Sequence, residues 1–259
     1  MLWPALLLAA GVPLPRQIYV HGFIYARGER LSKSAGNVVE PVDLAERFGV
    51  DALRFYLLHA IPTGRDGEFT LEQLVEHCNT HLANDLGNLA SRSVTMVHKY
   101  FDGTPPDDWD PACLRDASAR EGLDALVAAT TSAADQVPAA FLELRVHEAL
   151  EHAWAPVVRA NEFIERVKPW ALAKDPARRP ELATALNALL ETLRLVAVWA
   201  WPAIPQKCEE LWSLLALPGH PGEVRGDGAR PAYGDGAFTG RALGEVKSLF
   251  PRIELEAKA

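Results

Sequence analysis

The sequence predicts a mainly α-helical protein, with a short N-terminal part of mixed helix and strand followed by an antiparallel bundle of helices. Strand-like apolar runs are confined to the first forty residues. From residue 70 onward, apolar side chains recur at helical spacing instead. Short turns containing Pro and Gly separate the helical stretches, which favours antiparallel packing of neighbours.

The N-terminal part is predicted to contain a short helix, a strand and a loop. The apolar run at residues 6–10 has no Lys or Arg before it, unlike a secretory signal, and it is too short to span a bilayer. We therefore interpret it as an interior helix. Residues 18–25 are apolar and predict a strand, and Arg27–Glu29 predicts a turn that leads into the loop Arg30–Asn37.

Five helices are predicted in the bundle. Thr70 is expected to cap the first, with Gln73 three residues later as in a capping box. Pro138 is placed in the first turn of the third helix, which Pro156 should kink and which must end before Pro169. The expected ranges are about 70–101, 114–137, 138–168, 180–201 and 205–217.

The remaining chain changes character. Gly and Pro dominate residues 218–244, which predicts a loop or an extended linker. Residues 249–254 are apolar again and are expected to dock back on the body. We divide the chain into residues 1–65, a helical domain at residues 66–217, and a linker with a docking C-terminal segment at residues 218–259.

Composition fits a globular protein without an obvious nucleic-acid signature. The 259 residues are 49% hydrophobic and carry a net charge of −8. Residues 1–65 nevertheless hold seven basic and five acidic side chains, so the acidity lies further along the chain. An acidic protein that binds RNA must gather its cations on one face, and its binding should depend on salt.

The cysteines and histidines predict no metal site. Cys78, Cys113 and Cys208 are far apart and form no Cys-x-x-Cys pair, which argues against a zinc knuckle or a disulfide framework. They fit small buried side chains in a protein of the reducing cytoplasm. The eight histidines are expected to be scattered through helices and loops.

The loop Arg30–Asn37 is the strongest local signal for chemistry. Lys33 lies between Ser32 and Ser34, with small residues beyond them, so its ammonium group can move. A mobile point charge suits a polyphosphate whose charge shifts during reaction. Taken alone, a solvated surface lysine is the commoner meaning of such a short motif.

Together with the apolar run before it and residues 49–58 after it, this loop resembles the Lys-Met-Ser-Lys-Ser signature of class I aminoacyl-tRNA synthetases. It is most similar to the methionine–tRNA ligase family. Arg30 stands where the first lysine is usual, and Leu31 where methionine is usual. Residues 1–65 are then a remnant of the class I α/β catalytic domain. The resemblance implies Lys33 as the catalytic side chain, and it implies the following ATP-binding residues: Arg30, Ser32, Lys33, Ser34, His21 and Gly22.

Two further motifs could read RNA. Asn88 and Arg92 are four residues apart on one helix face, and an amide beside a guanidinium suits base edges. Pro169 ends a helix and presents Trp170, a platform for one unstacked base. From the residues alone, a solvated Asn–Arg pair is the commoner meaning of the first motif, and a core tryptophan is an equal alternative for the second.

The resemblance to methionine–tRNA ligases implies that both motifs hold the tRNA(Met) anticodon, through Asn88, Arg92, Pro169 and Trp170. We expect Asn161 to be structural. Asp51 and Arg54 are interpreted as scaffold residues that tie the loop to the bundle.

The first class I signature, His-x-Gly-His, does not occur in this sequence, and no βαβ series carries it. In the family, that signature lies in the N-terminal half of the enzyme. The resemblance therefore implies that ATP, as its magnesium complex, and methionine are bound only together with that N-terminal half. Three hypotheses remain: the C-terminal part of a methionine–tRNA ligase, a stand-alone non-catalytic tRNA-binding module, or an unrelated helical interaction protein. Without the other half, Leu2, Leu6, Leu7 and residues 18–24 should expose an apolar patch.

Overall fold

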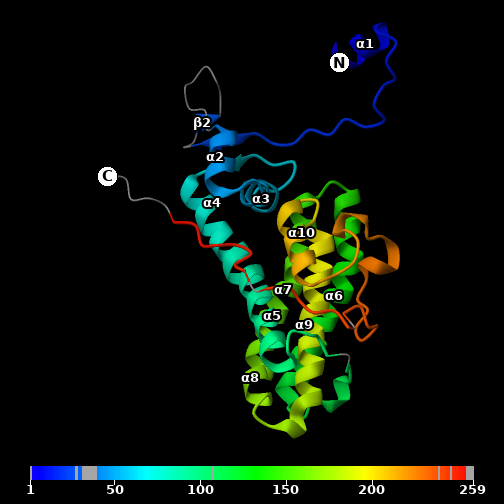
Figure 1. The fold of residues 1–259 in the computed structure, drawn as a ribbon. Helices are drawn as coiled ribbons and strands as arrows, with labels where there is room; N and C mark the ends of the chain where they lie inside the picture. Colours follow the sequence, from blue (N-terminus) through cyan, green and yellow to red (C-terminus); the bar gives the residue numbers. More distant parts are fainter. Residues whose placement is uncertain are drawn as a thin grey trace.

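Helix α9 (Arg179–Ala200) forms the axis of the molecule in the computed structural model, which describes residues 2–26, 29–30, 40–106, 108–238, 240–245 and 247–254. Nearly all its side chains are buried, so it needs partners around its whole circumference. These partners are α5 (Asn88–Phe101), α6 (Ala117–Leu142), α7 (Val146–Val167), α8 (Pro169–Leu172) and α10 (Pro205–Leu214). The resulting bundle (Figure 1) confirms the predicted mainly α-helical fold.

The segment Pro176–Ala200 is long and apolar enough to cross a membrane by length and composition alone. In the described structure, however, 94% of its apolar window is buried inside the protein. It is therefore the core helix of the bundle.

A buried ion pair joins α9 to the chain that follows the bundle. Arg194 donates through Nε and one terminal nitrogen to both carboxylate oxygens of Glu191, each at 2.7 Å. The same guanidinium donates to the carbonyls of Gly228 and Arg230, and Glu191 accepts from the amide of Ala232. The pair therefore fastens residues 228–232, which include part of the 3₁₀ turn η7 (Gly226–Ala229), onto the core helix.

The N-terminal part holds helix α1 (Leu2–Ala9) and a small sheet in the order β2-β1-β3. Strand β1 (Ile24–Ala26) runs antiparallel to β2 (Glu29–Arg30) and parallel to β3 (Gly67–Glu68). The predicted strand at residues 18–25 is therefore wrong over residues 18–23. Because β2 and β3 are each two residues long, they offer backbone partners only near the end of that run.

Helix α1 and the chain leading to β1 extend away from the bundle (Figure 1). Four large apolar side chains of residues 18–23 are exposed, together with Leu2, Trp3, Leu6 and Leu8 of α1, which buries no residue. This agrees with the expected apolar patch, although Leu7 is half-buried.

A short helical segment connects this part to the bundle. It consists of α2 (Pro41–Phe48), α3 (Val50–Phe55) and the π-helical segment η2 (Tyr56–Ala60). Asp51 Oδ2 accepts a 2.7 Å hydrogen bond from the amide of Lys207 in the first turn of α10, where Ile204 supplies no cap. Arg54 donates to the carbonyls of Pro202 and Ala203. These two side chains fix α3 to the start of α10, as expected of scaffold residues.

The first predicted bundle helix is continuous from Leu71 to Phe101, but its middle is not α-helical. It consists of α4 (Leu71–His77), the π segment η3 (Cys78–Gly87) and α5. Thr70 Oγ1 accepts from the amide of Gln73 at 3.1 Å, which confirms the predicted cap. The predicted apolar stripe is largely buried.

The boundary between the second and third helices was predicted wrongly. Pro138 lies inside α6, which is capped by Asp116 and continues to Leu142. The helix ends where Leu144 adopts a left-handed conformation (φ 60°) and the Arg145 amide donates back to Ala140 O. No Gly or Pro marks this stop. Helices α9 and α10 lie close to their predicted ranges, and short 3₁₀ turns accompany the bundle at Pro111–Cys113, Pro176–Arg178 and Pro221–Glu223.

The C-terminal segment docks on the body, as predicted. Asn79 and Ile253 exchange two hydrogen bonds, of 2.9 and 2.8 Å, and Leu249 is buried. Further back, the amides of Leu243 and Gly244 donate to Gly103 O and Leu214 O. The segment thus lies along the continuous 71–101 helix (Figure 1).

Replacing Arg194 with Met should destabilise the protein by about 3–5 kcal/mol, because Glu191 would remain buried without its partner. Urea unfolding followed by far-UV circular dichroism measures this loss. Arg159→Met removes an exposed pair with Glu162 on α7 and should cost no more than about 1 kcal/mol. Equal losses in the two variants would contradict the anchoring role of the buried pair.

Replacing Asp51 with Ala should cost about 1–3 kcal/mol, because the Lys207 amide loses its acceptor at the start of α10. Burial raises the pKa of the Asp51 carboxyl, so its surroundings do not favour the charged form over the neutral one. Asp51→Asn keeps an oxygen acceptor and should therefore recover most of the lost stability in the same unfolding assay. An Asn variant as unstable as the Ala variant would show that the charge matters more than the hydrogen bond.

Candidate nucleic-acid interface

Two motifs that are far apart in the sequence meet at one end of the bundle. Arg92 lies on α5 and Trp170 on α8, and the guanidinium carbon of Arg92 is 5.7 Å from the Trp170 ring centroid. This is within the distance of a cation–π contact. The structure therefore places the predicted guanidinium and the predicted indole side by side.

The position of Trp170 follows from the end of α7. Lys168 adopts a left-handed conformation (φ 48°, ψ 67°), which stops the helix and turns the chain. Pro169 then begins α8, since its fixed φ suits a first helical position. Pro169 is buried and holds the turn, while Trp170 is 39% exposed. Trp154, by contrast, is 3% exposed, so Trp170 is not a core tryptophan.

Arg92 is held by a second charge. One of its terminal nitrogens donates to Glu165 Oε1 at 2.7 Å. The Arg92 side chain is 30% exposed and the Glu165 side chain 63%, so water and ions reach the pair. Such an exposed pair contributes little stability and can exchange its partner for an RNA group.

Asn88 is exposed one helical turn before Arg92. Within the part of the chain that the structure describes, its side chain makes no hydrogen bond. Both the donor and the acceptor of its amide therefore face solvent. Leu89 is fully buried and fixes the register of this helix face.

Asn161 lies behind this face rather than on it. Its Nδ2 atom donates to the carbonyls of Asp85 at 3.2 Å and Val157 at 3.1 Å. The bond to Asp85 joins α7 to η3, and the bond to Val157 lies within α7. Its Oδ1 atom is buried without a partner among the described residues. The geometry agrees with a structural role for Asn161.

The structure describes only some of the residues that were predicted to bind ATP. Ser32, Lys33 and Ser34 lie outside the described residues. Arg30 lies in β2 opposite Tyr25 of β1, so the loop begins at the edge of the small sheet.

His21 and Gly22 lie just before β1. His21 is exposed, with Nδ1 2.7 Å from Gly22 O. Gly22 closely approaches the backbone of residues 65–66, and a Cβ there would lie 1.9 Å from Arg65 O. Gly22 thus has a packing reason to be glycine, independent of any nucleotide.

Sequence reasoning missed Glu165, the acidic partner of Arg92. The two residues lie on different helices, so no local pattern could pair them. The described residues that could hold a metal are three histidines outside this interface, and they are discussed below.

Comparison with known proteins identifies relatives for the whole chain. A family model described as "tRNA synthetases class I (M)" matches residues 1–94. The methionine–tRNA ligase of Clostridium acetobutylicum is 38% identical over 259 residues, which is 99% of this chain and 38% of that protein. The Brucella suis enzyme is 38% identical over 96% of this chain and 46% of its own length.

Solved structures give the same answer for the fold. Apo methionyl-tRNA synthetase of Mycobacterium tuberculosis superposes with a TM-score of 0.79 and 33% identity, covering 98% of this chain and 47% of that one. Its complex with methionyl-adenylate gives a TM-score of 0.79 and 35% identity over 97% of this chain and 47% of that one. The chain spans less than half the length of these relatives. In sequence and in fold, the chain belongs to the methionine–tRNA ligase family of class I aminoacyl-tRNA synthetases.

Proposed function

We propose that this chain is the part of a methionine–tRNA ligase that binds the tRNA(Met) anticodon and carries the ATP-phosphate loop. The observation that carries the proposal is the contact of Arg92 with Trp170, next to the open amide of Asn88. An exposed indole, a guanidinium and an amide are the groups that proteins use to bind unstacked bases of an RNA loop.

Each side chain has a distinct task in this proposal. One anticodon base stacks on the exposed face of Trp170, whose position Pro169 fixes. Asn88 donates to and accepts from a base edge. Arg92 leaves Glu165 and pairs with a base or phosphate, while Lys168, which is exposed beside Trp170, adds positive charge.

The ATP-phosphate part of the proposal rests on the sequence resemblance. In the whole enzyme, ATP and methionine form an adenylate, and Lys33 stabilises the charge on the departing pyrophosphate. Arg30, Ser32 and Ser34 surround that lysine in sequence, and His21 and Gly22 lie nearby in the chain. Residues 1–65 would then be the end of the catalytic domain.

The exposed apolar side chains of α1 and residues 18–23 support a chain that works together with a catalytic half. A surface patch of this kind marks an interaction site in soluble proteins. The alternative function, a non-catalytic tRNA-binding module, uses the same RNA site but needs neither this patch nor Lys33.

Replacing Trp170 with Ala should weaken binding of an RNA stem-loop carrying the methionine anticodon by about 1–3 kcal/mol, because one stacked base loses its platform. Fluorescence anisotropy with labelled RNA measures the affinity. Trp3→Ala is the matched control, since Trp3 is also exposed but lies on α1, at the opposite end of the molecule from α8 (Figure 1). Equal affinities for the Trp170 variant and the parent would contradict the anticodon assignment.

Glu165 and Arg92 give a test of opposite sign at the same site. Glu165→Gln removes a negative charge and frees Arg92, so the stem-loop should bind more tightly by about 0.2–1 kcal/mol. Arg92→Ala should weaken binding, and the exposed pair of Arg159 and Glu162 provides control variants on α7. A stem-loop with a changed anticodon should bind the parent more weakly, because the base-edge contacts proposed for Asn88 and Arg92 depend on the identity of the base.

The purified 259-residue chain should not catalyse methionine-dependent exchange of pyrophosphate into ATP, because the sequence has no His-x-Gly-His motif. The standard radiolabel exchange assay measures this, with Lys33→Ala as the comparison. Exchange by the parent that disappears in the Lys33 variant would contradict the expectation, and it would place a complete adenylate-forming site within this chain.

A further inference from the structure

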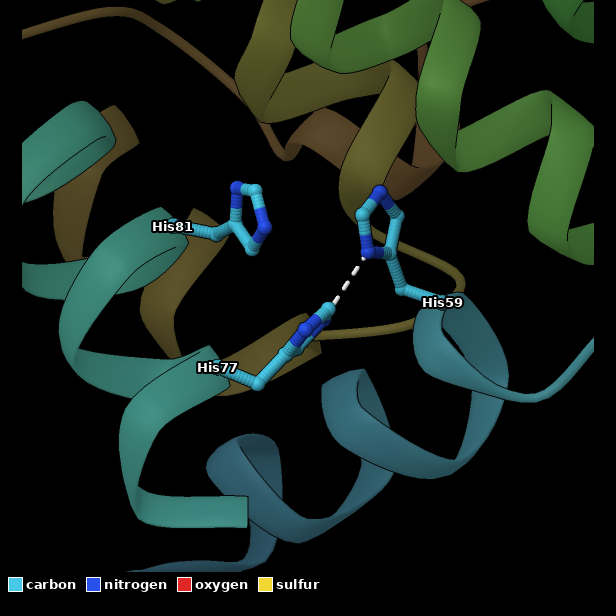
Figure 2. A group of neighbouring side chains, drawn as sticks. All are labelled: His59, His77 and His81. Carbon is cyan, nitrogen blue, oxygen red and sulfur yellow. Dashed lines mark hydrogen bonds between the residues drawn. The ribbon is translucent and has the colours of Figure 1, made fainter. Parts of the chain in front are cut away.

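Three of the eight histidines, which were expected to be scattered, gather between two helical segments. Figure 2 shows the rings of His59, His77 and His81 turned toward one another. One nitrogen from each ring lies within 4.8 Å of the others, and His59 Nδ1 is hydrogen-bonded to His77 Nε2 at 2.9 Å. The three ring centroids are separated by 4.9, 5.1 and 4.6 Å.

The backbone that carries these histidines is unusual. His77 and His81 are four residues apart, the spacing that places two histidines on one helix face. His81 lies in η3, His59 lies in η2, and His77 is the last residue of α4, directly before η3. The segments η2 and η3 are the two π-helical segments in the described part of the chain. π-helical turns are rare and occur frequently at functional sites.

Aromatic residues hold the cluster from its buried side. Phe55 is fully buried and stacks on His59 with ring centroids 4.8 Å apart and an interplanar angle of 13°. Trp154 packs against Phe55 at 4.5 Å and donates its Nε1 hydrogen to His81 O at 3.2 Å. The histidine-bearing segments are thus fixed by side chains that could not themselves bind a metal.

The chemical state of the rings suits metal binding. The hydrogen bond between His59 Nδ1 and His77 Nε2 needs one of these nitrogens as an unprotonated acceptor, so at least one free electron pair already points into the cluster. His81 Nδ1 lies 3.2 Å from Asp85 Oδ2. A carboxylate in this place fixes the tautomer and leaves Nε2 of His81 as the ligand atom.

A cavity beside the three histidines offers space and access for a metal ion. A cavity of about 530 Å³ is lined by His77 and His81 and by the acidic side chains of Glu68 and Glu76. It gives the cluster an open side on which an ion can enter and keep a water ligand. Tetrahedral zinc with bonds of about 2.0–2.1 Å needs ligand nitrogens roughly 3.3 Å apart. The His59–His77 pair, at 2.9 Å, is already that close, and the ligand nitrogen of His81 lies within 4.8 Å of both.

We propose that His59, His77 and His81 form a binding site for a transition-metal ion, with zinc as the best fit and Asp85 as the carboxylate that orients His81. Three imidazoles and one open position match the ligand number of zinc sites that retain a water. The ion would replace the His59–His77 hydrogen bond and join η2 to the continuous 71–101 helix. The absence of a Cys-x-x-Cys motif does not bear on a site of this kind.

The chelator-treated 259-residue chain, titrated with Zn²⁺ and Co²⁺, tests the proposal. One equivalent should bind by calorimetry, and Zn²⁺ at 100 times its Kd should raise Tm by about 5–10 °C. His59→Gln, His77→Gln and His81→Gln should each abolish this equivalent. Asp85→Asn should weaken it roughly 10–100-fold. His152→Gln, a change on α7, should bind like the parent.

A gain-of-signal variant covers the case in which a glutamine variant fails to fold, as judged by circular dichroism. His81→Cys replaces one ligand with a thiolate, so it should still bind Co²⁺ and add a sulfur-to-cobalt charge-transfer band that the parent lacks. The proposal is overturned if the parent binds no Zn²⁺ or Co²⁺, or if folded glutamine variants bind as the parent does. A folded Cys variant that binds Co²⁺ without the new band would also overturn it.

Discussion

The burial of α9 on all sides is the constraint on which the rest of the structure depends. Because this helix buries mostly apolar side chains on every side, it is stable only when other helices enclose it. α5, α6, α7, α8 and α10 do so, and the polar residues within α9 serve as fixed anchor points. Glu191 and Arg194, for example, bind the segment after the bundle from inside the core.

The same constraint assembles the candidate RNA site. Arg92 and Trp170 are brought together because α5 and α8 both pack on α9, with α7 leading into the turn at Lys168. No direct bond between the two motifs is needed to align them. The site therefore depends on a rigid scaffold, whereas its contact groups remain exposed.

The sequence predicted the helices well where chemistry marks their ends. Thr70 capped the first helix as expected, and Lys168-Pro169 ended the third. It failed at Pro138, because a proline costs one backbone hydrogen bond and a well-packed helix can tolerate that loss. The strand at residues 18–23 failed for a different reason: strand partners come from distant segments, here only two residues of β3, and a local pattern cannot show their length.

The candidate sites show the same limit. The four-residue spacing predicted that Asn88 and Arg92 share one helix face. Pro169, as a helix-ending residue, predicted that Trp170 is presented next to the end of the helix. The pairing of Glu165 with Arg92 depends on tertiary packing, and so does the contact of His59 with His77 and His81. Neither could be predicted from local sequence. The two π segments were also not predicted, since Leu82 and Leu86 of η3 keep the four-residue apolar spacing of an ordinary helix.

The uninterrupted helix from Leu71 to Phe101 has a mechanical consequence. Its α-helical parts, α4 and α5, rise 1.5 Å per residue and together span roughly 30 Å, and the helix runs from the small sheet to the end of the bundle where α8 lies (Figure 1). The helix fixes the distance between its two ends. It also fixes the relative direction of side chains at those ends, since each α-helical residue turns the helix by about 100°. The wider winding of η3 sets the angle between its two ends. The direction in which Asn88 and Arg92 face Trp170 is therefore set by the backbone of η3 and not by any contact residue.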